Sequence, residues 1–221
     1  MLRRFQDVGL QPEVPALLPG RTRLCWPFEM ASRFVRRDRV VGRLMAALYA
    51  DLAGYSRLFH RDDIRTVVRL RHMHRLLRPV IRWYSGRIAQ TGGDSLLVTF
   101  DSVGEALKCA VMIQQVMARE NDGWPEDDSL RLRVGVDLGD VIREGRDFHG
   151  SGIIVAVRLQ EVCPPGGVCV SRAAHDRGGC TQLGLPFEPA GELVLKNVPQ
   201  PVEAFVLRPP DGSRTGLRLV E

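Results

Sequence analysis

Apolar residues recur through residues 44–138 in an order that predicts strand, helix, hairpin, helix and strand. Residues 44–50 form a short apolar run that ends at a Gly-Tyr-Ser turn, as a buried strand does. Over residues 62–84 the apolar positions return at intervals of three and four, which predicts an amphipathic helix. Residues 87–91 and 95–100 flank a glycine turn and are predicted to form a hairpin.

A second helix is predicted to follow, capped by Asp101 or Ser102, and residues 130–138 alternate as in a strand. This order predicts a ferredoxin-like βαββαβ core of the α+β class, with its helices on one face of an antiparallel sheet. The later pattern predicts elements that extend this antiparallel sheet: a short strand near Val141, a loop, a helix over about 152–161, and strands at 167–170, near Glu192 and at 202–207.

The positive charge of the chain is concentrated ahead of this core. The 221 residues carry a formal net charge of +5, and residues 1–43 hold nine arginines against four acidic residues, so residues 44–221 are balanced. The first 43 residues also contain four prolines and no sustained period. We predict a weakly structured basic arm, or a translated leader ahead of a start at Met30 or Met45. The remaining boundaries are predicted as one domain over 44–208 and a tail over 209–221.

The composition argues against a membrane-spanning, secreted or RNA-binding protein. The apolar run at 44–50 is too short to cross a bilayer, and no apolar segment follows Arg3 and Arg4 as in a signal peptide. Five cysteines without metal-binding spacing indicate reduced, buried or inert thiols in a cytoplasmic protein. Aromatic residues make up 6% of the chain and do not follow the pattern of an RNA-recognition sheet, so no specific nucleic-acid partner is expected.

Two carboxylates stand where they could bind hard divalent cations. Asp51 follows the first predicted strand, and Asp94 lies at the tip of the glycine turn between the hairpin strands. Mg²⁺ and Mn²⁺ accept one or two protein carboxylates together with substrate phosphate oxygens. The alternative is that both residues are ordinary turn carboxylates.

Five motifs occur in a particular order: residues 50–56 (ADLAGYS), 91–94 (TGGD), 134–141 (VGVDLGDV), 155–159 (VAVRL) and 195–197 (LKN), the last before Pro201 and Val202. In these motifs the chain resembles the catalytic domain of class III adenylate and guanylate cyclases, particularly the bacterial ones, from about residue 45 to 207. The resemblance implies the cyclase fold and a dimer with active sites at the subunit interface. It also implies conversion of a nucleoside triphosphate to a 3′,5′-cyclic monophosphate and pyrophosphate in cyclic-nucleotide signalling.

The resemblance assigns the metal site to Asp51, Asp94 and the backbone carbonyl of Leu52. Two Mg²⁺ or Mn²⁺ ions held there would lower the pKa of the ribose 3′-hydroxyl and neutralise the triphosphate. The turn before the long helix could bind phosphate through its backbone amides. These amides belong to Ala53, Gly54, Tyr55 and Ser56.

Three further residues match family positions that act on the nucleotide. Arg158, on an otherwise apolar predicted helix, would stabilise negative charge on the α-phosphate; a pair with Glu161 is the alternative. Lys196 would contact the triphosphate, and a solvated surface lysine is the alternative. Asp147 matches a base-recognising aspartate that could accept a hydrogen bond from the adenine amino group, although an aspartate solvated in a loop is also compatible with the sequence.

Two positions depart from the family pattern. Gln90 stands where adenylate cyclases of this kind carry a base-recognising lysine. A glutamine amide can donate or accept a hydrogen bond, so this residue leaves the choice of base open, and ATP is expected as the substrate more than GTP. Ile154 replaces the asparagine that orients the ribose and the transition state. Loss of one donor at a comparable site typically costs roughly 10²–10³ in rate, so reduced activity is expected.

Both departures fall in the set of residues that the family's second subunit contributes. We therefore hypothesise that this chain keeps a good metal half and an eroded base half, and acts as a homodimer or as a heterodimer with a complete cyclase. One alternative is a pseudocyclase, a nucleotide-binding or heterodimerising regulatory module without turnover. Another is a diguanylate cyclase, because residues 92–94 imitate part of a GGDEF turn, although Ser95 and Leu96 replace the acidic-aromatic pair that should follow.

Overall fold

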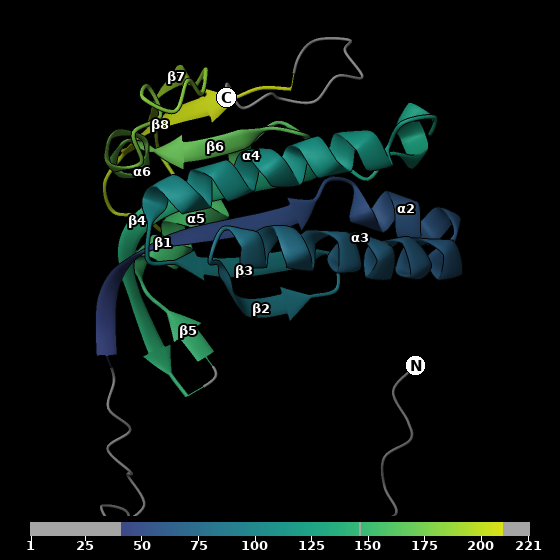
Figure 1. The fold of residues 1–221 in the computed structure, drawn as a ribbon, viewed down its shortest axis with the longest axis horizontal. Helices are drawn as coiled ribbons and strands as arrows, with labels where there is room; N and C mark the ends of the chain where they lie inside the picture. The colour runs from purple at the N-terminus through teal and green to yellow at the C-terminus, as the bar shows by residue number, and fades with distance from the viewer. Residues whose placement is uncertain (1–40, 146, 210–221) are drawn as a thin grey trace, which may run out of the picture. The chain divides into compact units, whose positions relative to one another are not determined.

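The computed structural model describes residues 41–145 and 147–209. The predictions for the basic arm, the start at Met30 and the tail beyond residue 209 lie outside these residues. The helices and strands follow one another as in Figure 1: β1 (Val41–Leu52), α2 (Tyr55–Arg61), α3 (Asp63–Trp83), β2 (Arg87–Gly92), β3 (Ser95–Phe100), α4 (Val103–Glu120), the 3₁₀ turn η1 (Glu126–Asp128), β4 (Leu132–Glu144), β5 (Asp147–His149), α5 (Ser151–Val162), β6 (Val168–Ser171), α6 (Arg172–Arg177), β7 (Glu188–Leu193) and β8 (Val202–Leu207).

The strands form one sheet in the order β2-β3-β1-β4-β6-β8-β7, with β5 paired to β4. Four of these strands, β2-β3-β1-β4, together with α3 and α4, make the predicted ferredoxin-like βαββαβ core, which is thereby confirmed. The prediction of an antiparallel extension was wrong at β6, which pairs with β4 in parallel. The helix α5 connects these two strands, and such a crossover brings the chain back in the same direction.

Three local differences from the predicted elements affect the site. Strand β1 begins at Val41, three residues before the predicted start. The strand predicted near Val141 is not separate, because β4 continues through Gly139 and Asp140, which pair with Met45 and Leu44 of β1. The segment predicted as a loop after it contains β5, which forms a hairpin with the end of β4.

Different helices cover the two faces of β1 (Figure 1). Ala46 and Leu48 pack into the main core with α3 and α4. On the opposite face, Ala47 packs with Val141 and with Ala156 of α5. The prediction that the two core helices share one face is confirmed for α3 and α4. Helix α5, which follows the core, covers the opposite face, because β1 is apolar at consecutive positions and is buried on both sides.

Helix α5 lies directly on the backbone of β4. A Cβ atom at Gly135 would lie 2.0 Å from the carbonyl oxygen of Ala156, and one at Gly139 would lie 2.6 Å from the Cα of Gly152. Two glycines spaced by four on the strand thus face two small residues spaced by four on the helix. The VGVDLGDV motif therefore has a packing role, since a side chain at either glycine would push the helix off the sheet.

Among the described residues, all four cysteines are free and buried. Burial raises the pKa of Cys109 to about 12 and that of Cys169 to about 11. It does the same to Cys163, with a pKa of about 12, and to Cys180, with a pKa of about 11. The predicted buried, inert thiols are confirmed at these four positions, and Cys25 lies outside the described residues.

Candidate active site

The structure brings Asp51 and Asp94 together at the end of β1. The backbone N–H of Leu52 donates to the carbonyl oxygen of Asp94 at 3.2 Å, which fixes the β2–β3 turn beside the strand end. Burial raises the pKa of Asp51, and the charge of Asp94 raises it further. A partly buried carboxylate whose charge is disfavoured by burial and by a neighbouring carboxylate favours an added cation.

Arg133 also belongs to this cluster and was not predicted from the sequence. It lies opposite Asp51 in the β1–β4 register, and its Nη2 is 3.1 Å from Asp51 Oδ2. The arginine opposes the rise in the pKa of Asp51 without reversing its direction. A single arginine in an alternating strand usually faces solvent, so the pattern alone gave no signal for this contact.

Buried Gln160 of α5 closes the cluster from the other side. Its amide could donate to Asp51 Oδ2 at 3.4 Å. Turned by half a rotation, the same amide accepts from Arg133 Nε and Nη2 at 3.1 and 3.3 Å. We favour the second orientation because its contacts are shorter and involve a charged donor.

The residues at this cluster fit ions that share their ligands with a substrate. Across the described part of the chain, no group of three or more His, Cys, Asp or Glu side chains could hold a metal ion. Mg²⁺ does not need such a group, because it usually keeps waters and binds one or two carboxylates together with substrate phosphates. Asp51, Asp94 and the carbonyl of Leu52 match that limited donor set.

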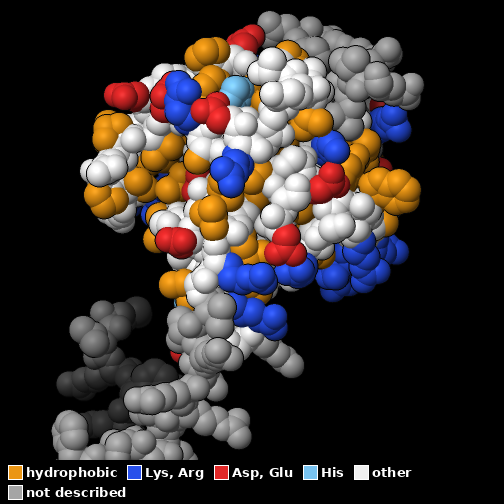
Figure 2. Space-filling view, turned by 60° about the vertical axis from the view of Figure 1, so that its left-hand side comes forward, with side chains coloured by type: hydrophobic (Ala, Val, Ile, Leu, Met, Phe, Trp, Pro, Cys, Tyr) orange, Lys and Arg blue, Asp and Glu red, His pale blue; other side chains and the backbone are white. Residues whose placement is uncertain are grey.

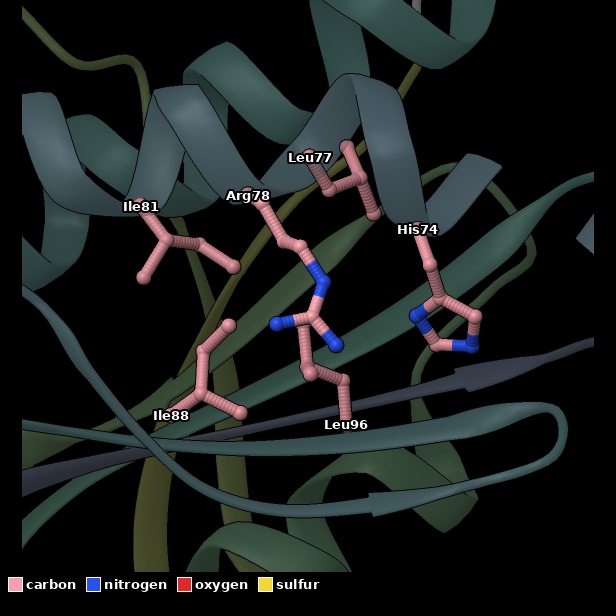
Figure 3. A pocket seen from close by; sticks show the side chains of 6 residues that line it. All are labelled: His74, Leu77, Arg78, Ile81, Ile88 and Leu96. Carbon is pink, nitrogen blue, oxygen red and sulfur yellow. The ribbon is translucent and has the colours of Figure 1, made fainter. Parts of the chain in front are cut away.

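The turn that carries Asp94 is also held from α3. The ring nitrogen Nε2 of His74 lies 2.9 Å from the carbonyl oxygen of Gly93. His74 stands at one end of a small hollow between α3 and the β2–β3 hairpin (Figure 3). This hollow contains none of the predicted site residues: its lining is His74, Leu77, Arg78, Ile81, Ile88 and Leu96.

The turn predicted to bind phosphate differs from its prediction in one respect. Gly54 adopts a left-handed conformation with φ of 72°, which suits the glycine, and the chain then enters α2. The turn was expected to precede the long helix directly, but the seven-residue α2 lies between it and α3. The sequence does not reveal the break between α2 and α3, because the polar run Arg61-Asp62-Asp63 at the junction is equally compatible with the start of one helix. Gly54 and Ser56 are exposed, so their backbone amides remain candidates for phosphate contacts.

Arg158 and Lys196 are neighbours in the structure. The Nε of Arg158 donates to the backbone carbonyl of Lys196 at 3.0 Å, and the Lys196 side chain is exposed. Nη1 of Arg158 forms an ion pair with Glu161, the alternative that the sequence had left open. Ile154 precedes Arg158 by one helical turn and is 49% exposed.

Helix α5 separates these residues from the carboxylates. Gln160, which points toward Asp51, is 3% exposed, whereas Ile154 and Arg158 lie on the outward face of the same helix. Within one chain the two predicted halves of the site therefore face different directions. One subunit alone does not bring Arg158 to the carboxylates.

Asp147 and Gln90, the two predicted base-recognising residues, lie on strands that contact each other. Asp147 begins β5 and pairs with Glu144, so it belongs to a hairpin rather than to the loop that was predicted. The hairpin projects from the sheet in Figure 1, and β5 contacts β2, which carries Gln90. Both side chains are exposed.

Asp137, a further carboxylate that was not singled out from the sequence, is buried in β4. It is 6% exposed, and burial raises its pKa, although a hydrogen bond from Ser171 and one from the Leu138 backbone oppose the rise. The alternation of β4 places it on the same face as Gly135, toward α5. It does not belong to the Asp51 cluster and acts on stability.

Comparison with known proteins identifies the family. No family model matches the chain. A Rhizobium meliloti protein named "Putative adenylate cyclase 3" is 38% identical over 187 residues, which are 84% of this chain and 31% of that protein. An adenylate cyclase of Streptomyces coelicolor is 29% identical over 137 residues, or 62% of this chain and 34% of the relative. The chain thus spans about a third of these relatives.

A solved structure covers the fold more completely. The adenylate/guanylate cyclase/hydrolase from Silicibacter pomeroyi is 34% identical, with a TM-score of 0.72 over 77% of this chain and 99% of that one. The chain belongs to the class III adenylate/guanylate cyclase family. Within the described residues, no helix has both the length and the apolar character needed to cross a membrane.

Proposed function

We propose that this chain is a nucleotidyl cyclase domain that converts ATP, in preference to GTP, to the 3′,5′-cyclic nucleotide and pyrophosphate in cyclic-nucleotide signalling. The observation that carries the proposal is the meeting of Asp51 and Asp94 at the end of β1, with Arg133 beside them. Membership of the cyclase family supports the same reaction class.

Asp51, Asp94 and the carbonyl of Leu52 would hold two Mg²⁺ or Mn²⁺ ions. When bound, the ions supply a lowered pKa for the attacking hydroxyl and positive charge for the triphosphate. The repulsion between the two carboxylates supports this assignment, because a divalent cation between them turns an unfavourable interaction into a favourable one.

Arg133 has a role that follows from its position. Its guanidinium neutralises Asp51 in the free protein, and it remains 29% exposed. A planar guanidinium offers five donors, so Arg133 can keep its contact with Asp51 and Gln160 and still donate to a phosphate oxygen. We assign it to the triphosphate, together with the backbone amides of the exposed residues Gly54 and Ser56.

The reaction forms a bond between the ribose 3′-oxygen and the α-phosphorus and breaks the bond from that phosphorus to the bridging oxygen. The proton of the 3′-hydroxyl is lost to solvent, and pyrophosphate leaves. Negative charge increases around the α-phosphate during this exchange, so a guanidinium fixed there would favour the transition state. Arg158 is the residue for this role, with Lys196 on the departing phosphates.

The site is completed by a second subunit. Arg158 and Ile154 face away from Asp51 on α5, so the nucleotide must lie between the metal side of one chain and the outward α5 face of another. Nucleotide binding then has to draw Arg158 away from Glu161. A homodimer meets this requirement, as does a heterodimer with a complete cyclase.

Ile154 sets the expected rate. It presents an exposed hydrocarbon side chain where the proposed site needs a donor for the ribose, so the wild-type homodimer should be slow. The same observation favours the second candidate function, a pseudocyclase that binds nucleotide and dimerises without turnover.

The test compares cyclic product from purified wild type and Ile154→Asn, each with Mn²⁺ and either ATP or GTP. Ile154→Asn should raise product formation by about 10²–10³. Val162→Asn is the matched control, because Val162 is 52% exposed on the same helix, and it should change nothing. Correctly folded dimers that form no product with either residue at position 154 would establish the pseudocyclase instead.

Complementation tests the interface. The double variant Asp51→Asn/Ile154→Asn loses the metal half and regains the base half, whereas the wild type has the opposite arrangement. Neither homodimer should be efficient, but a mixture should contain heterodimers with one complete site. A mixture no more active than its components, with subunit exchange verified, would refute a site shared between chains.

A further inference from the structure

The outward side of α3 carries a continuous row of exposed side chains that the cyclase site does not use. Helix α3 buries one face in the main core through Leu70, Met73, Leu77 and Ile81. The exposed residues on the other face follow helical spacings of three and four, so they share one line along the helix. We call this row the α3 stripe: Ile64, Val68, Arg71, Arg75, Arg78 and Arg82. Arg78 lies at the edge of the stripe, where it also lines the hollow beside the β2–β3 hairpin (Figure 3).

The arginines of the α3 stripe have no ion-pair partner among the described residues. The contrast with neighbouring arginines is clear, since Arg61 pairs with Asp128 and Arg87 with Asp101. Residues 63–83 contain six arginines and one acidic residue, although the sequence from residue 44 onward is balanced in charge. The positive charge of the domain is therefore local, and Figure 2 shows a concentration of Lys and Arg side chains on one side of the molecule.

Large apolar side chains accompany these arginines. Ile64 is 75% exposed and Val68 is 55% exposed at the beginning of the α3 stripe. Trp83, at its far end, is 82% exposed. The α3 stripe therefore combines guanidinium groups with exposed aliphatic side chains, and an exposed tryptophan lies beside its C-terminal end.

We propose that the α3 stripe binds the surface of an anionic lipid bilayer. The guanidinium groups match the charge of acidic headgroups, and their aliphatic stems can lie along the interface. Tryptophan favours the headgroup level of a bilayer, and isoleucine and valine gain from shallow contact with acyl chains. A nucleic acid matches the charge equally well but offers no partner for exposed aliphatic side chains, so the lipid surface fits the whole stripe better.

The expected strength comes from the number of arginines. One basic residue near an acidic membrane surface contributes about fivefold to binding. The four arginines of the α3 stripe together correspond to roughly 10²–10³-fold, a reversible attachment that weakens as salt screens the charges. The proposal is independent of the cyclase reaction, because none of these residues belongs to the candidate active site.

The test measures sedimentation of the full chain with vesicles of phosphatidylcholine alone and with one-quarter phosphatidylglycerol. Arg71→Glu/Arg75→Glu removes and reverses two charges in the α3 stripe. Arg177→Glu/Arg208→Glu is the control with the same net charge, because these exposed arginines lie at the other end of the sheet, Arg177 as the last residue of α6 and Arg208 directly after β8. The basic arm is present in every protein, so differences between the variants come from the position of the charges.

The stripe variant should bind anionic vesicles at least about 25-fold more weakly than wild type, with a much smaller loss in the control. Trp83→Ala should weaken binding at high salt, where electrostatic attraction is screened. Equal losses in the stripe variant and its control would overturn the proposal. So would stripe-dependent binding of a short DNA or RNA oligonucleotide together with unchanged vesicle binding, which would assign the surface to nucleic acid.

Discussion

Replacing Gly135 by alanine tests whether α5 rests on the bare backbone of β4. The added Cβ would meet the carbonyl oxygen of Ala156 at 2.0 Å and the backbone nitrogen of Gln160 at 2.6 Å. Both obstacles are backbone atoms, so no side-chain rotation can remove the collision. Gly135 does not have a positive φ, and alanine is therefore compatible with its backbone conformation.

The size of the effect follows from the displacement that is needed. The contact with Ala156 must lengthen by about 1 Å or more before it reaches distances that Cβ atoms show. Overpacking of this kind costs typically 1–3 kcal/mol. For a chain of this size, about 3 kcal/mol lowers Tm by roughly 6–12 °C. Because Gln160 moves with the helix, the Asp51–Arg133 cluster is disturbed as well, and a 1 Å error at a site can cost about 10²-fold in rate.

Calorimetry of Gly135→Ala beside Gly42→Ala gives the measurement. Gly42 is the matched control, since it also lies in a strand and its added Cβ would meet Ile142 Cγ1 at 3.6 Å, an ordinary contact. The control should keep the wild-type Tm, whereas Gly135→Ala should lose several degrees. Equal Tm values for the two variants would show that α5 does not approach β4 this closely.

Three further results are expected. Burial raises the pKa of Asp137, so above the ordinary aspartate pKa its folded form binds protons more tightly than the unfolded chain does, and this residue lowers stability as pH rises. The Tm of Asp137→Asn relative to wild type should therefore increase as pH rises from the ordinary aspartate range, and a difference in Tm that is constant with pH would contradict the burial. Burial and the charge of Asp94 raise the pKa of Asp51, and protons would compete with Mn²⁺ for this carboxylate. As the pH is lowered, the Mn²⁺ affinity measured by calorimetry should therefore begin to fall at a higher pH in wild type than in Asp94→Asn. His74→Ala should weaken Mn²⁺ binding about fivefold with little change in Tm, because the contact with Gly93 positions the turn that carries Asp94. His74→Asn, which keeps a hydrogen-bond donor, should retain part of the affinity. Unchanged Mn²⁺ binding in both variants would show that His74 does not position the turn.

The apolar periodicity of the sequence was sufficient to predict the βαββαβ core, because a long helix or strand repeats its pattern of apolar positions several times. The helices α3 and α4 and the strands around them were located within a few residues. Short elements were missed: α2 and α6 have seven and six residues, and β5 has three, too few for a period to emerge. Gly139 and Asp140 look like a turn in the sequence, yet their pairing with β1 carries β4 straight through them.

The candidate site divides in the same way. The sequence motifs were sufficient to single out Asp51, Asp94, Arg158 and Lys196 as candidates. In the structure Asp51 lies near Asp94, and Arg158 lies near Lys196. Arg133 and Gln160 could not be found, because their importance comes from register and from the close approach of α5, both properties of tertiary packing. Helical spacing alone places Ile154 and Gln160 on different faces, but it does not say which face meets the carboxylates.

The four buried cysteines have a practical consequence for following assembly. Alkylating reagents attack the thiolate, and burial keeps Cys109, Cys163, Cys169 and Cys180 protonated at neutral pH. Once Cys25 is changed to serine, a cysteine introduced at exposed Ser151, at the start of α5, would be the preferred target of a spin label or fluorophore. Distances between such labels on two copies would report how the chains come together, and how that arrangement responds to nucleotide.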